Sequence, residues 1–525
     1  MNDSNVVLTL VTFIPAAGAV VLMLLPRNDQ LLRTIALLVS LVAFVVSIFL
    51  PVNYDSAKGG FQFVVDTPWI GQSIHYHLGI DGISLWLVLL TTILVPLSVL
   101  ISWKSIHDRV KEFFVLLLLL ETAMIGVFVS LDMFLFYVFW EATLIPMALL
   151  IGMYGHERRV YAAVKFFLYT MVASVFMLAS IIYLYLHTPA PHTFDYNAIW
   201  KVLHDPNSYA FSPAVLQWLF LGFFVAFAVK VPLFPFHTWL PDAHVEAPTA
   251  GSVLLAAVLL KMGTYGLLRF NLGLFPEQAK RNAPWIIVLA IIGIIYGALV
   301  ALVQPNLKKL IAYSSVSHLG FVVLGIFTFT QMGTDGAVYQ MLNHGISTGA
   351  LFMLAGMIYE RKHTYELTAF GGLATPMPVY ATFFLVVVLS SVGLPLLNGF
   401  VGEFLVLSGA FQYKMLAGIL GTTGVIWGAA YLLWMYQKVF YGPIRHEENN
   451  HLVDIGVREQ ISLWPLAALA LIMGVASPLW MKSIDPAVAE MRGKAAAVAH
   501  ISNGSGTGAP VSPKVPVASA MPGMK

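Results

Sequence analysis

The sequence predicts an all-α polytopic membrane protein. Of its 525 residues, 59% are hydrophobic and only 10% are charged, and the mean hydropathy is +0.82. A soluble domain carries about 25% charged residues. Apolar windows of about 20 residues recur along the chain, which is the length that a helix needs to cross a hydrocarbon core of about 30 Å. A net charge of +2 on a chain of this length gives no reason to expect a nucleic-acid partner.

About fourteen of these windows are expected to be transmembrane helices. The first, Val6 to Leu25, lacks the basic residues and the small-residue cleavage site of a secretory signal, so we interpret it as the first retained span. The approximate bounds of the expected spans are 6–25, 32–51, 82–103, 113–130, 132–154, 161–187, 214–240, 249–272, 284–304, 310–330, 336–359, 379–411, 415–441 and 461–481.

Two segments outside these windows carry other signals. Residues 59–81 have aromatic and β-branched residues around Pro68 and Gly71, which predicts a short extramembrane hairpin between the second and third spans. Beyond residue 486 the chain is rich in Ala, Gly, Ser and Pro, which predicts a disordered tail. The expected divisions are 1–112 with the hairpin, a central core over 113–441, a last span within 442–486 and a tail over 487–525.

Lysine and arginine are unevenly distributed between alternate loops. Fourteen of them, including Lys308 and Lys309, fall on one side and six on the other. Because cytoplasmic loops are enriched in Lys and Arg, both termini are predicted to lie outside the cytoplasm.

Two of the expected spans contain proline within apolar sequence. The seventh reads AVKVPLFPFHTWLP and the twelfth reads SSVGLPLLNGFVGE. Proline removes a backbone donor, and freed backbone groups at membrane depth must be buried in protein or face water, so broken helices commonly line transport sites. Five spans separate the two breaks, which predicts that spans 4–8 and 9–13 are repeats of opposite topology.

Four ionisable residues lie inside apolar stretches, namely Glu141, Lys230, Lys261 and Glu403. A charge at mid-bilayer costs about 2.5–3.5 kcal/mol on insertion scales, so each is a candidate functional residue. We hypothesise that Glu141 tunes the proton affinity of Lys230, that the proton passes to Lys261, and that Glu403 ends the path. The structural alternatives are a static salt bridge between Glu141 and Lys230 and a capping role for Glu403 at a half-helix.

Three histidines are candidate relay groups, because neutral imidazole exchanges protons near physiological pH. His237 follows Lys230 by seven residues and shares its face wherever the helix is intact. His318 and His344 lie within the tenth and eleventh spans. Such histidines can instead be interhelical hydrogen-bond donors or, as a pair, axial ligands of a b-type haem.

Three further acidic or basic residues have simpler explanations. Glu121 is deep in the fourth span, with Thr122 beside it as a hydrogen-bonding neighbour, and it remains a candidate relay group. Lys165 is close enough to the start of the sixth span to reach the interface, and we also keep it as a candidate. Asp81 is expected to anchor the third span rather than to carry protons.

The chain has no cysteine, so it cannot ligate a cysteine-bound iron–sulfur cluster. If the protein works with electron transfer, the redox centres are expected on other chains. The phosphate-loop, dinucleotide, zinc-protease and acyl-transfer signatures do not occur in the sequence.

Four strings give the chain a family resemblance, namely FLFYVFWEATLIPM, KVPLFPFHTWLPDAHVEAPTAGSVLLAAVLLKMGTYGLLR, LKKLIAYSSVSHLGFV and NGFVGEFL. They resemble the antiporter-like membrane subunits of proton-pumping NADH:quinone oxidoreductase, respiratory complex I, and among these the NuoM type. The resemblance implies fourteen helices with two inverted five-helix repeats. It also implies a proton path from the Glu141–Lys230 pair through central Lys261 to terminal Glu403, with His237, His318 and His344 as connecting positions.

The resemblance further implies a translocase subunit that couples electron transfer elsewhere to proton pumping and binds no cofactor itself. NADH, FMN, iron–sulfur clusters and quinone are expected in partner subunits, and NuoL-like and NuoN-like neighbours in a bacterial plasma (inner) membrane. The related NuoL-like and NuoN-like chains usually carry lysine where Glu403 stands. The alternatives are a subunit of a Mrp-type cation/proton antiporter, a subunit of a membrane-bound hydrogenase, and a scaffold whose polar residues only hydrate and orient the bundle.

Overall fold

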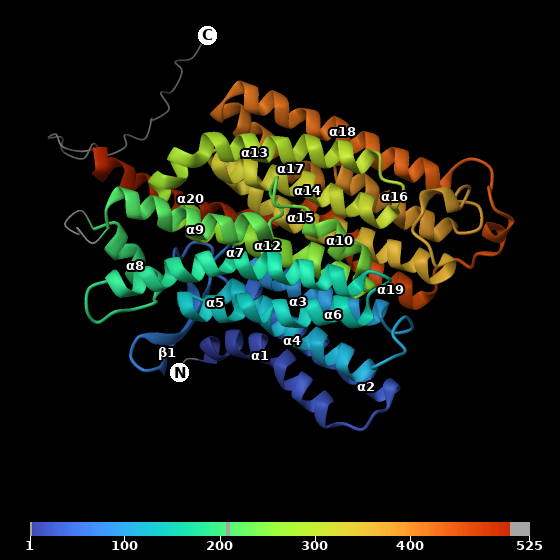
Figure 1. The fold of residues 1–525 in the computed structure, drawn as a ribbon, viewed down its shortest axis with the longest axis horizontal. Helices are drawn as coiled ribbons and strands as arrows, with labels where there is room; N and C mark the ends of the chain where they lie inside the picture. The colour runs from blue at the N-terminus through green and yellow to red at the C-terminus, as the bar shows by residue number, and fades with distance from the viewer. Residues whose placement is uncertain (1–2, 206–210, 504–525) are drawn as a thin grey trace, which may run out of the picture.

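A computed structural model of the chain describes residues 3–205 and 211–503 as a bundle of long helices that run along one common direction (Figure 1). Within these residues, twelve helices are long and apolar enough to cross a membrane, or thirteen if a bent pair near the C-terminus is one span. The all-α polytopic fold is therefore confirmed. The count of fourteen stays a prediction, because short helices make up the twelfth expected span.

Three long helices and a hairpin precede the expected repeats. They are α1 (Asp3–Leu24), α2 (Asp29–Asn53), β1 (Gln62–Ile70), β2 (Ile74–Ile80) and α3 (Ser84–Ile101). The two strands pair antiparallel, which confirms the hairpin. His77 Nδ1 lies 2.6 Å from Oδ2 of Asp195, which caps the short helix α8, so the hairpin is fastened to the bundle.

The first expected repeat contains α4 (Val110–Val129), α5 (Met133–Ala142), α6 (Leu144–Tyr154), α7 (Arg159–His187), α8 (Tyr196–Leu203), α9 (Pro213–Lys230), α10 (Trp239–Glu246) and one continuous span of α11 (Thr249–Leu254), η1 (Leu255–Leu259), α12 (Leu260–Gly266) and η2 (Leu267–Leu272). Here η1 and η2 are π-helical turns, a form that is frequent at functional sites.

The second expected repeat contains α13 (Pro276–Leu302), α14 (Leu307–Phe327), α15 (Gln331–Lys362), the 3₁₀ turn η3 (Leu367–Ala369), α16 (Pro378–Val392), α17 (Asn398–Tyr413) and α18 (Met415–Phe440). The chain then continues through the 3₁₀ turn η4 (Glu447–His451) to α19 (Val457–Val475) and α20 (Pro478–Asn503). The helices α19 and α20 meet at an angle of 70°.

Both helix breaks lie where proline predicted them. Helix α9 ends at Lys230 and α10 starts at Trp239, whose Nε1 donates to the freed carbonyl of Val229 at 2.9 Å. Helix α16 ends before Gly393, which has φ of +81°, and α17 starts five residues later. The opposite orientation of the two repeats stays a prediction.

The expected disordered tail is wrong for residues 487–503, which continue α20 to Asn503. The Ala-rich sequence of this segment favours a helix. Near its start, Asp485 accepts a hydrogen bond from Gln331 at the beginning of α15 (2.9 Å), and Arg492 donates back to that glutamine (2.7 Å). Residues 504–525 lie outside the described residues. Helix α20 lies at the same end of the bundle as α8 and the hairpin (Figure 1).

Candidate functional site

The four charged residues expected inside the membrane lie at or near irregular points of the bundle. Lys230 is the last residue of α9, and Lys261 lies on α12 between the two π-helical turns. Glu403 lies in α17 just beyond the second break, and Glu141 lies near the junction of α5 and α6. Lys230, Lys261 and Glu403 are buried, whereas Glu141 is half-buried.

Glu141 and Lys230 are not joined by a hydrogen bond. Glu141 accepts one from the Ser174 hydroxyl of α7, and the Lys230 ammonium has no hydrogen-bond partner among the described residues. That ammonium instead lies 5.3 Å from the ring centre of Trp140 and 5.6 Å from that of Phe166, where an aromatic face stabilises a cation. Because Lys230 is still within electrostatic range of Glu141, its charge is influenced by a carboxylate that is not fixed to it.

Lys261 contacts a histidine of α15. Its Nζ donates to the carbonyl oxygen of Ala256 at 2.5 Å and lies 2.5 Å from Nδ1 of His344. Since the protonated ammonium has only donors, Nδ1 of a neutral His344 is the acceptor and Nε2 carries the hydrogen. The histidine is thereby oriented to take a proton at one nitrogen and to release one from the other.

Beyond Lys261 and His344, a line of side chains continues through His318 to Glu403. We call these four residues the line. The rings of His344 and His318 have centres 5.9 Å apart. His318 Nδ1 lies 3.2 Å from Oε1 of Glu403, and the hydroxyl of Tyr431 lies 3.3 Å from the other ring nitrogen. Gln340 also donates to Glu403, at 3.3 Å. The structure thus brings Lys261, His344, His318 and Glu403 together, and it does not use Glu403 as a helix cap.

The environment of Glu403 depends on the backbone of the second break. A Cβ added to Gly393 would lie 2.9 Å from Oε2 of Glu403, and the positive φ of this glycine disfavours other residues. The break therefore supplies both the end of α16 and the space for the carboxylate.

His237 lies apart from this line. Because α9 ends at Lys230, no intact helix joins Lys230 to His237, and the shared face that an unbroken helix would give does not arise. The histidine lies in the break between α9 and α10, with its ring centre 5.1 Å from that of Tyr296 and 5.7 Å from that of Phe234. Its Nδ1 has no partner among the described residues.

Lys165 has polar partners, whereas Glu121 has none among the described residues. Lys165 pairs with Asp242 at 2.7 Å and donates to the carbonyl of Thr238 at 3.1 Å, so it fastens α7 to α10, the helix that follows the first break. Glu121 is fully buried, and neither of its carboxyl oxygens has a hydrogen-bond partner among the described residues. The explanation through Thr122 is wrong, because the Thr122 hydroxyl also lacks a partner there.

Asp81 anchors the third span, as expected. It accepts hydrogen bonds from the backbone of Ile83 and Ser84 at 3.1 and 3.0 Å. It also pairs with Arg269 of η2 at 2.5 Å, and both side chains of the pair are buried.

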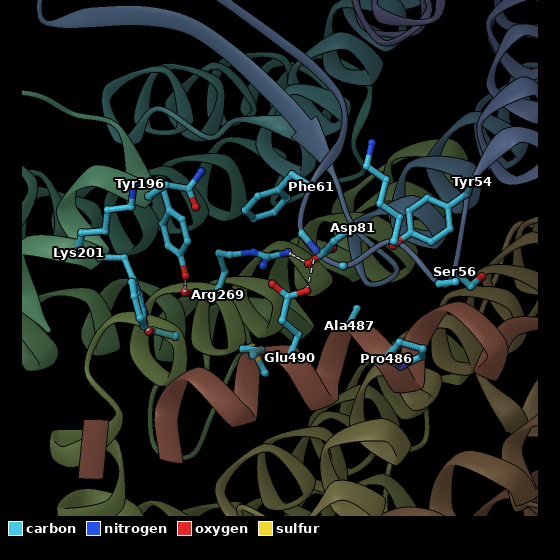
Figure 2. A pocket seen from close by; sticks show the side chains of 18 residues that line it. Tyr54, Ser56, Phe61, Asp81, Tyr196, Lys201, Arg269, Pro486, Ala487 and Glu490 are labelled. Atoms are coloured by element: carbon cyan, nitrogen blue, oxygen red, sulfur yellow. Dashed lines mark hydrogen bonds and ion pairs between the residues drawn. The ribbon is translucent and has the colours of Figure 1, made fainter. Parts of the chain in front are cut away.

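A cavity of about 650 Å³ lies beside this pair, between the hairpin, α8 and α20 (Figure 2). Arg269, Asp81 and Glu490 converge there, and Glu490 accepts a hydrogen bond from the backbone of Gly60 at 2.6 Å. None of the candidate residues at membrane depth lines this cavity. The contact between Glu490 and Gly60 beside it joins the N-terminal hairpin to the C-terminal helix α20. Within the described residues, His, Asp and Glu do not form a cluster suited to a metal ion.

Sequence reasoning missed several residues near the line. Ser174 and Tyr431 carry no signal, since serine and tyrosine are common in apolar helices. His244 of α10 is fully buried, and its ring lies 4.4 Å from that of Phe352. Its position in the string HTWLPDAHVEAP was a usable signal. Lys308 was counted as a loop cation but is buried at the start of α14.

Known proteins share this fold and sequence. Residues 130–427 match the family described as NADH:quinone oxidoreductase/Mrp antiporter, transmembrane. NADH-quinone oxidoreductase subunit M of Rhodobacter capsulatus is 46% identical over 92% of this chain and 96% of its own length. A chain of respiratory complex I from Thermus thermophilus superposes with a TM-score of 0.84, at 33% identity, over 93% of this chain and 99% of its own. A chain of the Mrp complex from a Dietzia species has the same fold, with a TM-score of 0.83 at 19% identity over 95% of this chain and 100% of its own.

Proposed function

The chain belongs to the NADH:quinone oxidoreductase/Mrp antiporter family as a subunit M, a proton-translocating membrane subunit of NADH:quinone oxidoreductase, and from this premise we propose that Lys230, Lys261 and Glu403 carry the protons. The observation that supports the assignment most directly is the buried line of Lys261, His344, His318 and Glu403. Each member of the line gains and loses a proton, and successive members lie close together.

Proton transfer along the line is balanced at every step. Lys261 gives a proton to Nδ1 of His344, and His344 releases the hydrogen of Nε2 toward His318. His318 then passes a proton from Nδ1 to Glu403. Each transfer leaves the hydrogen of a histidine on the opposite ring nitrogen, so the ring turns over and restores its first tautomer before the next proton enters. His237 is a connecting position near the first break, and Glu121 and Lys165 are secondary candidates.

Glu141 is the residue that couples events in neighbouring subunits to proton release from Lys230. A charge change in a neighbouring subunit draws Glu141 away from Ser174 and alters its distance to Lys230. Desolvation then favours the neutral amine of Lys230, which releases its proton toward Lys261. Because moving one charge against 100 mV requires about 2.3 kcal/mol, the driving force comes from electron transfer in partner subunits. These partners are NuoL-like and NuoN-like membrane subunits and the subunits that use NADH, FMN, iron–sulfur clusters and quinone.

The membrane is a bacterial plasma membrane, and both termini lie on its non-cytoplasmic side. The distribution of Lys and Arg between alternate loops supports this orientation. The hairpin, α8 and α20 then share the non-cytoplasmic end of the bundle (Figure 1).

The test is the number of protons moved per electron by the intact complex in sealed vesicles. Lys261→Ala and Glu403→Gln are expected to abolish pumping, and Glu403→Asp is expected to retain part of it because the carboxylate remains. Subunit content measured in the same preparations separates this result from failed assembly. An unchanged proton yield in assembled Lys261→Ala complexes would refute the proposal, whereas proton movement driven by a Na⁺ gradient without NADH would favour the antiporter class.

A further inference from the structure

The cavity between the hairpin, α8 and α20 has the size and charge of a ligand site. Its volume is about 650 Å³, within the range of about 300–1,000 Å³ that is usual for sites of small molecules. Three of its lining residues are basic, Lys58, Lys201 and Arg269, and two are acidic, Asp81 and Glu490. Because Arg269 is paired with Asp81, the charges of the two lysines are balanced only by that of Glu490. The lining therefore carries one net positive charge and favours an anionic group.

Aromatic residues around this cavity are typical of the level of lipid head groups. Tyr54, Tyr196 and Trp200 line it. Trp86 and Trp480 lie near the start of α3 and of α20, with ring centres 5.6 Å apart. Tryptophan and tyrosine are enriched where a membrane protein passes from hydrocarbon to head groups, because their rings are amphipathic. The cavity is thus within reach of the surface of the bilayer.

An apolar groove continues from this level toward the middle of the bundle. It has a volume of about 180 Å³ and is lined only by apolar side chains, which come from α2, α3, α15, α19 and α20. On α2 the groove extends from Pro51 back to Phe44, and on α3 from Trp86 to Ile93, in each case about 10 Å along the helix. Both runs lead away from the hairpin, since α2 ends and α3 begins beside it. A groove with these walls is suited to a hydrocarbon chain.

The groove and the cavity share two helices. On α2, Pro51 lines the groove and Tyr54, three residues later, lines the cavity. On α20, Trp480 lines the groove and Ala487, seven residues later, lines the cavity. Residues at these spacings lie on one face of a helix, so the two hollows follow each other along the same faces. Figure 2 shows Tyr54 and Ala487 on the side of the cavity away from Lys201, which is consequently the side that the groove meets.

We propose that the cavity and the groove form one binding site for an anionic glycerophospholipid with a single phosphodiester. The phosphodiester lies in the cavity, where Lys58 and Lys201 neutralise it, and one acyl chain lies in the groove between α2 and α3. Its single negative charge matches the net charge of the lining. The apolar groove favours a lipid over a soluble phosphate ester, which has no part that would fill it. This site does not depend on the proposed proton path.

The test uses the intact complex in phosphatidylcholine vesicles with a minor fraction of phosphatidylglycerol that carries a diazirine on one acyl chain. Irradiation is expected to label peptides of α2 and α3 that line the groove, and an excess of unlabelled phosphatidylglycerol is expected to suppress that labelling. Equal suppression by phosphatidylethanolamine would overturn the assignment of an anionic lipid. Equal suppression by glycerol phosphate would assign the cavity to a soluble phosphate ester instead.

Removing the two exposed lysines tests the head-group part of the site. A lysine near an anionic lipid contributes about a fivefold preference, so Lys58→Gln and Lys201→Gln are each expected to lower groove labelling about fivefold. Lys280→Gln is the matched control, because Lys280 is an exposed lysine near the start of α13 that does not line the cavity. Its labelling is expected to equal that of the unaltered complex.

A larger side chain in the groove tests the acyl part of the site. Ile48 lines the groove and is 40% exposed, so Ile48→Trp fills the groove without disturbing the packed interior, and labelling is expected to fall several-fold. Val45→Trp, also on an exposed position of α2 but outside the groove, is the control and is expected to be labelled normally. Subunit content is measured in every preparation. Unchanged labelling in assembled Ile48→Trp complexes, or in complexes that lack both lysines, would overturn a single site formed by cavity and groove.

Discussion

The ammonium of Lys261 lies 2.5 Å from Nδ1 of His344, and both side chains are buried. Two positive charges only 4 Å apart repel each other by about 4 kcal/mol at an effective dielectric constant of 20, so the two groups cannot both be protonated without a large penalty. At most one of the two groups is therefore protonated at a time. Because the two groups exclude each other's charge, a proton can pass between Lys261 and His344 in either direction.

Replacing His344 is expected to interrupt the path without loosening the bundle. His344→Gln keeps an acceptor within reach of Lys261 but cannot take a proton at one atom and release it from another. The expected result is an assembled complex whose proton yield per electron falls several-fold. The measurement is quinone-dependent proton uptake by vesicles. A variant that pumps like the unaltered protein would remove His344 from the path.

Removing the hydroxyl of Ser174 is expected to change the position of Glu141, the residue that we propose couples this chain to its partners. A hydrogen bond to a charged group contributes about 1.5–3 kcal/mol, and Ser174→Ala removes the donor that Glu141 uses. Glu141 is then free to approach Lys230, and we expect a lower pumping rate at unchanged subunit content. Ser174→Thr restores the donor and serves as the control. Equal rates in the Ala and Thr variants would contradict this role.

The buried pair of Asp81 and Arg269 is expected to stabilise the contact between α3 and η2. Removing one partner of a buried pair costs about 3–5 kcal/mol, because the remaining charge stays buried. Arg269→Met should therefore lower the temperature at which the subunit leaves the complex, as followed by native electrophoresis after heating. Combining it with Asp81→Asn should recover part of the loss. No recovery in the double variant would show that the arginine acts mainly through its ring contacts with Phe61 and Tyr265.

The hairpin is expected to lose stability as pH rises. A side-chain hydrogen bond to Asp66, at 2.6 Å, raises the pKa of His75 above its usual value near 6.5. A raised pKa in the folded state contributes stability that is present below the unfolded value and disappears as pH rises through the folded value. Hydrogen exchange of residues 62–80, corrected for the intrinsic effect of pH, should show less protection at pH 9 than at pH 6. Asp66→Asn should remove that difference, and a difference that persists would assign it to another group.

Local sequence signals predicted the parts of the fold that depend on local chemistry. Pro232, Pro235 and Pro395 located both breaks. A proline nitrogen carries no hydrogen, so it cannot donate a backbone hydrogen bond in any tertiary environment. The hairpin followed from the aromatic and β-branched residues around Pro68 and Gly71. Hydropathy located the spans, because the requirement for about 20 apolar residues comes from the bilayer rather than from tertiary contacts.

The errors arose where spatial neighbours decide the outcome. Lys308 resembles a loop cation in sequence. It is buried because the end of α10 packs against it, and that contact has no signal in the sequence. The shared face of His237 and Lys230 was expected only where the helix is intact, and the break at Pro232 and Pro235 removes that condition. The helical part of α20 was missed because the composition of the whole tail was weighted above its Ala-rich first half.

Glu490 of α20 accepts a hydrogen bond from the backbone of Gly60, across 430 residues of sequence. At a ribosomal rate of about 5–20 residues per second, the two partners are made roughly 20–90 s apart. During that interval the newly inserted hairpin has no C-terminal helix to close over it. The end of the bundle that holds the hairpin, α8 and α20 (Figure 1) is consequently completed only after residue 490 has been made, and a nascent chain stopped before residue 490 would present this end to quality-control proteases in an open form.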